Sequence, residues 1–360
     1  MELTLVRDVL LGALAVAEKA LPNGTMVPVI NNILFEATGS RVKLKATNFE
    51  FEVVSQFDFD TAGELKALLP PKFAPIIGSL SGHEVVLAFE NGGVGVRVGI
   101  EDGSSKFKLL TQAADDYPLI GEHEPEGIPL EFSQGEFKEL LRQVLFCVSN
   151  DSSRPAFNGV LFRFDQAGLT VASSDAYRLA YKTIPGKAWE FAESALLVPG
   201  KTLKELARLL SDNSGKTVTI YPRDNQVIFR ADSFYFAARV LAEKYPDLSG
   251  VLPRSYLTKV VVPVRQLEAI IGRAALIAEG ANQAIRLNLT GGDLDIFAES
   301  QVGRVTETLP LESKEGDDVE LYINARFLSE ALKAVPGKAA ESASTARPGL
   351  SSSMPKAMIH

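Results

Sequence analysis

The sequence predicts an α+β protein of three repeated domains, and two observations carry that prediction. The chain has 360 residues, which is more than a single hydrophobic core usually serves, so two or three domains are expected. The same order of elements then occurs three times: a strand, a helix, two strands and a second helix, at a period of about 125 to 129 residues. A repeat of that length has the size of a domain and is too long for a solenoid unit.

Each repeat opens with a short apolar strand and continues into a helix. The opening strands are expected at 3–6, 129–132 and 260–264. The helices are expected at 7–20, 135–148 and 265–278. Their apolar residues recur at i, i+3 and i+4, as at Leu10 and Leu14, which is the pattern of an amphipathic helix.

Two strands and a second helix follow at the same period. The first strand is marked by Phe35, Phe162 and Leu287, which lie 127 and 125 residues apart. We expect this strand to span 29–35 in the first repeat and 156–162 in the second. The next strand alternates apolar and polar residues at 42–46, 169–171 and 294–298, as a half-buried strand does. The second helix starts at Lys72, Lys201 and Arg326.

The first two repeats end in three more strands, whereas the third does not. The closing strands are expected at 84–89, 94–98 and 106–110, and at 217–221, 226–230 and 234–237. Linkers are expected near 120–128 and 248–258, where Gly, Pro and Glu gather. After Gly337 the chain is rich in Ser, Ala, Pro and Gly without alternation, so no closing strand is expected. The predicted domains are 1–122, 128–250 and an incomplete 256–337, followed by an atypical tail at 338–360.

Composition narrows the class of function. The chain has 45 acidic and 37 basic side chains and a formal net charge of −8. This balance argues against a nucleic-acid coat over the whole surface but not against a local basic face. Cys147 is the only cysteine, so an internal disulfide and a thiolate cluster are excluded. With neither a signal peptide nor a membrane-spanning stretch in the sequence, we expect a cytoplasmic protein.

No convergent catalytic or metal-binding set can be read from the sequence. The three histidines, His83, His123 and His360, lie in a predicted turn, a linker and the last position. The segment 198–202 resembles the end of a phosphate-binding loop, but Ala195 stands where that loop needs its first glycine. We therefore expect no catalytic residue, no metal and no cofactor.

A cation recurs at the start of the second helix in all three repeats, at Lys72, Lys201 and Arg326. The helix dipole disfavours a cation there by roughly 0.3–1 kcal/mol, so an external anion would explain the recurrence. Further cations on the first helices are Lys138, Arg142, Arg265 and Arg273. If the three domains form an arc with these helices on one side, the concave face attracts phosphates without reading bases. The alternative is that all of them are ordinary solvated helix residues.

From residue 1 to about 337 the chain resembles the bacterial DNA polymerase III beta-subunit family, the sliding clamps. The segments that carry the resemblance are Phe157-Asn-Gly-Val-Leu-Phe162, Ser174-Asp-Ala-Tyr-Arg-Leu179, Val198-Pro-Gly-Lys201 and Tyr245-Pro-Asp-Leu-Ser-Gly-Val-Leu-Pro253. The resemblance implies domains with antiparallel sheets outside and two helices inside. It also implies that each chain forms half of a ring, and that two chains join head to tail around duplex DNA.

The implied function is that of a non-catalytic DNA polymerase processivity factor. Such a ring holds DNA without sequence specificity, by topology, and a homodimer forms it. The implied partners are the replicative polymerase, the clamp loader and repair proteins, which bind through short linear peptides in an apolar cleft. A three-domain protein-binding scaffold that does not encircle DNA is the alternative.

The resemblance also assigns residues to three surfaces. The DNA-facing cations are Lys72, Lys138, Arg142, Lys201, Arg273 and Arg326. The client-peptide cleft takes Phe157, Ser174, Ala176, Tyr177, Arg178, Leu179, Pro246, Val251, Asn324 and Phe327. The dimer interface takes Phe107 and Leu109 on the first domain, and Leu276 and Ile277 on the third domain of the partner.

The sequence departs from the family at several of these positions. Tyr177 stands where the family usually has histidine, Phe327 where tyrosine is common, and Gly250 where arginine is frequent. The closing strands and the family's Met-Pro-rich terminus are not recognisable after Gly337. One wall of the peptide cleft is therefore expected to differ from that of the family.

Overall fold

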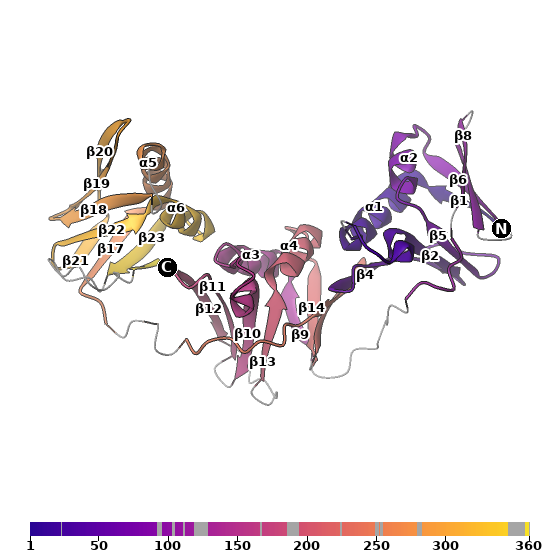
Figure 1. Cartoon of the computed structure of the whole chain (residues 1–360), viewed down its shortest axis with the longest axis horizontal. Coiled ribbons are helices and arrows are strands. Elements are labelled where there is room, and N and C mark those ends of the chain that lie inside the picture. The colour runs from indigo at the N-terminus through magenta and orange to yellow at the C-terminus, as the bar shows by residue number, and fades with distance from the viewer. Residues whose placement is uncertain are drawn as a thin grey trace. The chain divides into compact units, whose positions relative to one another are not determined.

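The structure is a computed structural model of the chain (Figure 1). It describes residues 1–22, 24–91, 96–102, 105–110, 112–118, 129–165, 168–185, 194–223, 225–248, 252, 255–278, 283–344 and 357–359. By contacts the chain divides into two compact units. The first contains Met1–Leu141, Ser149–Ala172 and Tyr181–Lys244, and the second contains Arg142–Val148, Ser173–Ala180 and the chain from Tyr245 onward.

The first domain has two antiparallel sets of four strands and two helices. One set follows the order β1 (Glu2–Val6), β6 (Glu84–Asn91), β7 (Val96–Asp102) and β8 (Ser105–Leu110). The other follows the order β5 (Leu65–Leu69), β2 (Ile33–Thr38), β3 (Arg41–Thr47) and β4 (Phe51–Asp58). The helices are α1 (Arg7–Ala17) and α2 (Phe73–Ser79), with 3-10 turns η1 (Glu18–Ala20) and η2 (Pro28–Asn31). α1 contacts α2 and packs on β3 and β4.

The second domain repeats this arrangement. One set of strands is β9 (Leu130–Ser133), β14 (Thr217–Pro222), β15 (Gln226–Ala231) and β16 (Phe234–Arg239). The other is β13 (Ser194–Pro199), β10 (Gly159–Asp165), β11 (Gly168–Ser174) and β12 (Leu179–Pro185). Its helical elements are α3 (Gln134–Leu145), η3 (Pro155–Asn158) and α4 (Gly200–Leu209).

The third domain has the same plan among its described residues. One set is β21 (Ser313–Gly316), β17 (Thr258–Pro263), β23 (Ala339–Ser344) and β24 (Ala357–Ile359). The other is β20 (Gly303–Pro310), β19 (Asp293–Ser300), β18 (Ala284–Thr290) and β22 (Val319–Asn324). The helices α5 (Val264–Ile277) and α6 (Ala325–Ala334) lie side by side (Figure 1). A single hydrophobic core is shared by strands of both sheets and both helices.

The strand pairings confirm the threefold repeat. In each domain the opening strand pairs antiparallel with the strand that follows the second helix: β1 with β6, β9 with β14, and β17 with β23. The landmark strands β2, β10 and β18 likewise pair on one side with the strand before the second helix. The prediction of three domains with antiparallel sheets and two helices each is therefore confirmed.

Two sequence expectations about strands were wrong. The landmark strands of the first two repeats begin at Ile33 and Gly159 and not at 29 and 156, because Pro28 and Pro155 start 3-10 turns, a position that suits proline. The segment after Gly337 does contain a strand: β23 forms six pairs with β17, and β24 pairs with β23. The alternation of β23 was missed because its buried residues are small, such as Ala340 and Ala343.

The second helices are amphipathic and place their recurring cations outward. α4 buries Leu203 and Leu206 and leaves Lys201 exposed in its first turn. Asn324 caps α6, because its side chain accepts a hydrogen bond from the Phe327 N–H at 3.1 Å. None of the helices in the described part of the chain is long and apolar enough to cross a membrane.

A continuous eight-stranded sheet joins the first and second domains within the first unit. It forms because β4 pairs antiparallel with β16, the last strand of the second domain. Phe51 of β4 and Phe236 of β16 stack there with ring centroids 4.9 Å apart. Phe229 meets the Phe236 ring edge-on at 6.1 Å. The two domains therefore share backbone hydrogen bonds and an aromatic cluster.

We predict that Phe236→Ala destabilises the first unit by about 3–5 kcal/mol, the usual cost of removing a fully buried phenylalanine. The change removes two aromatic contacts at the strand pairing that joins the domains. Urea unfolding followed by circular dichroism measures the loss. Phe49→Ala is the matched control, since Phe49 is 44% exposed, and it should cost less than about 1 kcal/mol. Equal losses in the two variants would contradict the assigned role of the β4–β16 junction.

Candidate functional site

A tight turn between β11 and β12 presents three of the predicted cleft residues. The Ser174 hydroxyl accepts the Ala176 N–H at 3.0 Å and donates to the Arg178 carbonyl at 2.8 Å. Asp175 Oδ1 accepts the N–H groups of Tyr177 and Arg178, each at 3.0 Å. Ala176 takes a left-handed φ of 75°, which an alanine adopts only under constraint. The turn is thereby fixed, and Tyr177 is left 64% exposed.

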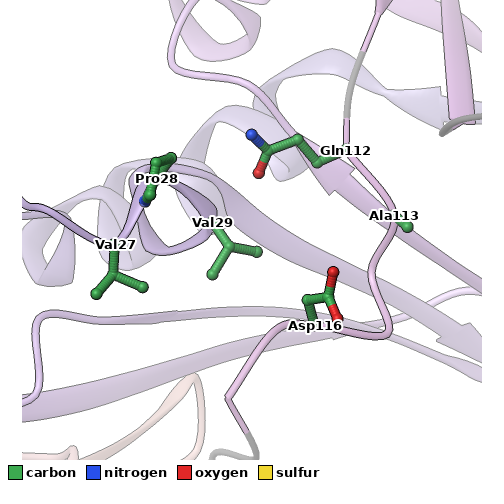
Figure 2. Close-up of a pocket in the computed structure, with 6 residues that line it drawn as sticks. All are labelled: Val27, Pro28, Val29, Gln112, Ala113 and Asp116. Carbon is green, nitrogen blue, oxygen red and sulfur yellow. The ribbon is translucent and has the colours of Figure 1, made fainter.

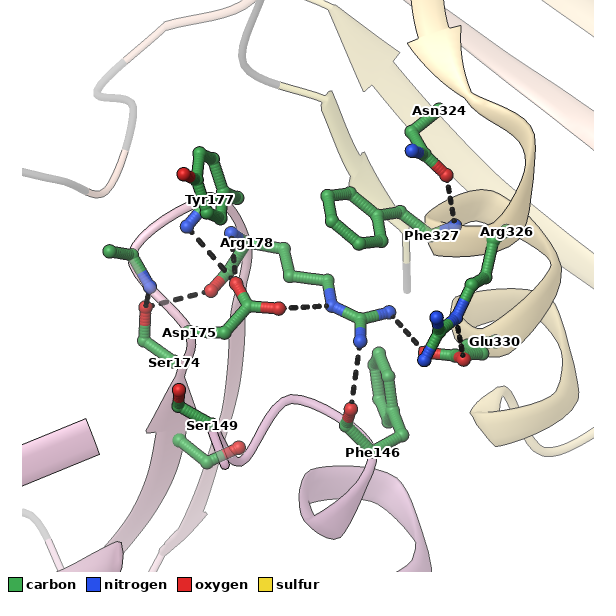
Figure 3. Close-up of polar contacts among 12 residues, drawn as sticks. Phe146, Ser149, Ser174, Asp175, Tyr177, Arg178, Asn324, Arg326, Phe327 and Glu330 are labelled. Atoms are coloured by element: carbon green, nitrogen blue, oxygen red, sulfur yellow. Dashed lines mark hydrogen bonds and ion pairs between the residues drawn. The ribbon is translucent and has the colours of Figure 1, made fainter. Parts of the chain in front are cut away.

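Arg178 is the centre of a polar network that holds α6 (Figure 3). Its Nε donates to Asp175 Oδ2 at 2.9 Å, and its guanidinium forms a 2.6 Å ion pair with Glu330 of α6. A third contact runs from Arg178 to the Phe146 carbonyl at 3.0 Å. Charge-assisted contacts of this kind are stronger than hydrogen bonds between neutral groups.

The same guanidinium is covered by aromatic rings. It lies 4.4 Å from the centroid of Phe327 and 5.3 Å from that of Phe146, both in cation–π range. The Phe327 ring is also 6.3 Å from the Tyr177 ring. Figure 3 shows Phe327 and Phe146 on opposite sides of the Arg178 guanidinium, with Tyr177 on the same side as Phe327. We call Tyr177, Arg178 and Phe327 the aromatic–arginine shelf.

Glu330 is held ionised by two arginines. Partial burial alone would raise its pKa, but hydrogen bonds from Arg326 and Arg178 dominate and hold the pKa below its ordinary value. Arg326 Nε lies 2.9 Å from Glu330 Oε1. The carboxylate therefore stays charged at neutral pH and keeps the shelf attached to α6.

Arg142 also binds α6, at its other end. The guanidinium donates to the carbonyl oxygens of Lys333 and Ala334, the second at 3.2 Å. A cation at a helix C-terminus is stabilised by the dipole and by the unpaired carbonyls. Arg142 was expected to face DNA, which stays a prediction, and in the structure its guanidinium has these two carbonyl partners within the protein.

The second unit contains eight of the ten predicted cleft residues among those that the structure describes. Six of them lie at or next to the shelf: Ser174, Ala176, Tyr177, Arg178, Asn324 and Phe327. Leu179 opens β12 beside them and is half-buried, and Pro246 is exposed. Phe157 lies on η3, which belongs to the first unit. Val251 lies outside the described residues.

Sequence reasoning missed Asp175, Glu330 and Phe146, each of which binds Arg178. Asp175 stood inside the recognised segment between Ser174 and Ala176, and its short side chain before a turn was a usable signal. Glu330 lies four residues after Arg326 on a helix, which predicts an ion pair between those two. No local sequence pattern predicts the ion pair between Glu330 and Arg178, because the two residues are far apart in the chain.

The predicted DNA-facing cations fall into two groups. Lys72 precedes α2 and Lys201 begins α4, and both are exposed and form no ion pair within the described residues. Three others are already paired: Lys138 with Asp212 at 2.8 Å, Arg273 with Glu307, and Arg326 with Glu330. Arg265, at the start of α5, is exposed like the two lysines.

The predicted dimer residues lie on two different surfaces. Phe107 and Leu109 belong to β8, the edge strand of its sheet, and Phe107 is 38% exposed. Leu276 is 79% exposed near the end of α5, whereas Ile277 packs partly against the core of the third domain. The two surfaces are unlike, which suits a head-to-tail contact better than a self-complementary one.

Chemistry by a nucleophile or a metal finds no support among the described residues. Burial raises the pKa of the Cys147 thiol to about 12, with the charge of Arg178 opposing that rise. A thiol of this kind is protonated at neutral pH and is not a nucleophile. Within the residues that the structure describes, no group of three or more His, Cys, Asp or Glu side chains could hold a metal ion.

Three domains built on this plan, with an exposed aromatic–arginine shelf and with lysines at helix starts that form no ion pair among the described residues, are typical of a binding protein of the sliding-clamp class. Family models match the chain in three consecutive parts: the DNA polymerase III beta subunit N-terminal domain at 1–121, its central domain at 131–247 and its C-terminal domain at 249–347. The chain therefore belongs to the DNA polymerase III beta-subunit family. Its function is that of a DNA polymerase processivity factor, and a scaffold without DNA is not favoured.

Relatives support the same assignment along almost the whole chain. The beta sliding clamp of Bacillus subtilis is 27% identical over 352 residues, covering 94% of this chain and 91% of that protein. That of Staphylococcus epidermidis is 29% identical over 347 residues, covering 93% and 90%. The solved Bacillus subtilis clamp superimposes with a TM-score of 0.88 at 25% identity, covering 95% and 92%. The DNA polymerase III subunit beta of Pseudomonas aeruginosa gives 0.88 at 25% identity, covering 100% and 96%.

We predict that acid weakens the attachment of α6 through Glu330. Because the folded-state pKa is depressed, the contribution of Glu330 is complete above its ordinary pKa of 4.5 and is lost as the pH falls through the folded value. Glu330→Gln should cost about 1–2 kcal/mol of unfolding free energy at pH 7, and much less at pH 3.

Urea unfolding of the full chain at both pH values measures this difference. Glu320→Gln is the control, because Glu320 is more exposed and lies 3.8 Å from Arg286. A loss for Glu330→Gln that is the same at pH 7 and pH 3 would show that its charge does not hold the network.

Proposed function

We propose that two chains join head to tail into a closed ring around duplex DNA, and that the ring is a non-catalytic accessory to the replicative polymerase. The polymerase, the clamp loader and repair proteins would bind it through short linear peptides. The observation that carries this proposal is that the first and third domains expose unlike apolar surfaces while belonging to one family of repeated domains. As a replication protein with one unreactive cysteine, it would act in the cytoplasm.

The head-to-tail junction is supported by the chemistry of its two faces. On β8 the edge strand leaves Phe107 38% and Leu110 75% exposed. An edge strand with apolar side chains promotes association with other chains unless a partner covers it. On the third domain, Leu276 offers a large exposed apolar side chain. A single contact, made twice in a dimer, would cover both the apolar edge strand β8 and the exposed Leu276 side chain.

DNA retention is supported by Lys72 and Lys201, which are exposed and unpaired among the described residues. Both lie at the start of a second helix, where the helix dipole disfavours a cation. A DNA phosphate bound to each lysine would offset that cost. Arg273 and Arg326 can contribute only in competition with Glu307 and Glu330. We propose that the unpaired lysines carry more of the phosphate interaction than the paired arginines.

Client binding is supported by the aromatic–arginine shelf. Tyr177 and Phe327 offer ring faces to apolar anchors, and Asp175 and Glu330 hold Arg178 against Phe327. Apolar anchors on aromatic surfaces, next to a fixed charge, are a common way of capturing short peptides. This shelf is where we place the client peptide.

We predict that Leu276→Asp weakens dimerisation at least about thirtyfold, because a charge at an apolar contact loses about 2 kcal/mol or more. Analytical ultracentrifugation at micromolar concentration measures the change. Tyr177→Asp, at an exposed aromatic outside the proposed junction, should dimerise as the unchanged protein does.

In the same preparations, dimers should be retained on nicked circular DNA and lost on linearisation. Equal loss from circular and linear DNA would refute encirclement.

We predict that Lys72→Glu combined with Lys201→Glu lowers DNA affinity and flattens its salt dependence. Removal of two phosphate contacts should reduce the slope of log affinity against log salt by about 2. Lys182→Glu is the matched control, because Lys182 is exposed on strand β12 and forms no ion pair within the described residues. Fluorescence anisotropy with a labelled duplex over a range of salt measures the slopes. The proposal fails if the two changes give the same slope as Lys182→Glu.

A further inference from the structure

The first domain contains an open pocket lined by none of the residues proposed to contact DNA, client peptides or the second chain. Its cavity volume is about 370 Å³, within the range of sites that take small ligands or peptide side chains. The lining residues are Val27, Pro28, Val29, Gln112, Ala113 and Asp116. Figure 2 shows the first three along η2 on one side, facing the other three across the opening.

The floor of this pocket, which we call the η2 pocket, is fixed by a buried cluster. Val29 packs against a group that includes Leu34, Ala114 and Tyr117. The Tyr117 hydroxyl donates to the carbonyls of Asn32 at 3.3 Å and Lys45 at 3.4 Å. The backbone of η2 is closed by the Ile30 N–H, which donates to the Val27 carbonyl at 3.3 Å. The two walls are therefore held apart by packed structure.

The turn that presents the client shelf has a counterpart in the first domain, 127 residues earlier. The Thr47 hydroxyl accepts the Phe49 N–H and donates to the Phe51 carbonyl, both at 3.0 Å. Asn48 Oδ1 accepts the N–H groups of Glu50 and Phe51 at 3.0 Å. Phe49 has a φ of 69°, close to the 75° of Ala176. The turn at 47–51 thus repeats the turn at 174–178 bond for bond.

The η2 pocket lies on first-domain counterparts of two further elements that carry cleft residues. Pro28 of η2 corresponds to Pro155 of η3, the element of Phe157, again at 127 residues. The Phe157 N–H donates to the Arg154 carbonyl just as Ile30 donates to that of Val27. The segment that ends at Tyr117 corresponds to the one that ends at Tyr245 and Pro246. The pocket is therefore built from the same repeated parts as the client cleft.

The side chains of the pocket select a peptide with an apolar anchor beside a cation. Val27, Pro28 and Val29 form an apolar wall, continued by the fully exposed Met26. Opposite them lies Asp116, which is exposed. Neither Asp116 nor its exposed neighbour Asp115 forms an ion pair within the described residues. Two unpaired carboxylates repel phosphate and attract lysine or arginine. Charge thus favours a basic peptide over DNA.

We propose that the η2 pocket is a second docking site on this protein, which takes a short partner peptide with an apolar residue next to a lysine or arginine. This inference rests on the proposed function for one point only, that the ligand is a short peptide segment of a partner protein. A client could then be held at the shelf by one segment and at the first domain by another, which raises its effective concentration.

Disulfide trapping tests the site locally. Ala113→Cys places a thiol in the lining, while the native Cys147 is buried and protonated. The probes are acetylated, amidated peptides Leu-Phe-Lys and Leu-Phe-Gln, each carrying a thiopyridyl-activated cysteine. The introduced thiolate attacks the peptide disulfide and releases pyridine-2-thione, which reports the rate. The lysine peptide should react about tenfold faster than the glutamine peptide, and Asp116→Asn should reduce that preference to about twofold or less.

Ala62→Cys is the matched control, since Ala62 is exposed between Asp60 and Glu64 but lies outside the pocket. It should show at most about a twofold preference for lysine. The proposal is overturned by equal rates for both peptides in Ala113→Cys, by an equal preference at Ala62→Cys, or by loss of trapping when a short DNA duplex competes. Phe327→Ala, which damages the shelf, should leave trapping unchanged, so failure of the client cleft and failure of the η2 pocket are distinguishable.

Discussion

The ladder between the opening strand and the strand after the second helix is the constraint on which each domain depends. In the first domain it pairs Leu5 with Val85, so the chain between these two strands, residues 7–83, must fold before the ladder can close. The intervening chain supplies one helix, a complete four-stranded set and a second helix. Closing such a loop is costly in entropy, and the packed core of both sheets offsets it. Both helices of the domain lie between β1 and β6 in the sequence, so closing this ladder brings them together with both sets of strands.

This constraint also places the recurring cations. The second helix always follows the strand that pairs with the landmark strand, so its first turn lies at one fixed corner of every domain. Lys72, Lys201 and Arg326 occupy that corner in three different sequences. Their surroundings then decide what each can bind. Glu330, one turn along α6, neutralises Arg326, whereas α2 and α4 leave their lysines unpaired among the described residues.

Sequence was sufficient for features that repeat and insufficient for those that depend on distant partners. The period and the amphipathic helices located the six described α-helices, the opening strands and the landmark strands, because each leaves a local pattern, but the strands just before the second helices, such as β4 and β5, were not predicted. The strand β23 escaped because alanine and serine at buried positions carry no hydrophobic alternation. The partners of Arg142 and Arg273 escaped because they lie 191 and 34 residues away. An ion pair of that kind is decided by packing, which no local pattern reports.

The two copies of the turn show how one backbone supports two kinds of junction. At the position of Arg178 the first domain has Phe51, which stacks on Phe236 where β4 pairs with β16. The corresponding strand of the second domain, β12, is the edge of its sheet, and the described part of the third domain holds no counterpart of β16. An apolar side chain suffices where strand pairing joins two domains. In the second unit the residue at the same position of the turn, Arg178, supplies directional contacts to Glu330 and Phe327, so one turn geometry serves an apolar strand junction in one unit and a charged network in the other.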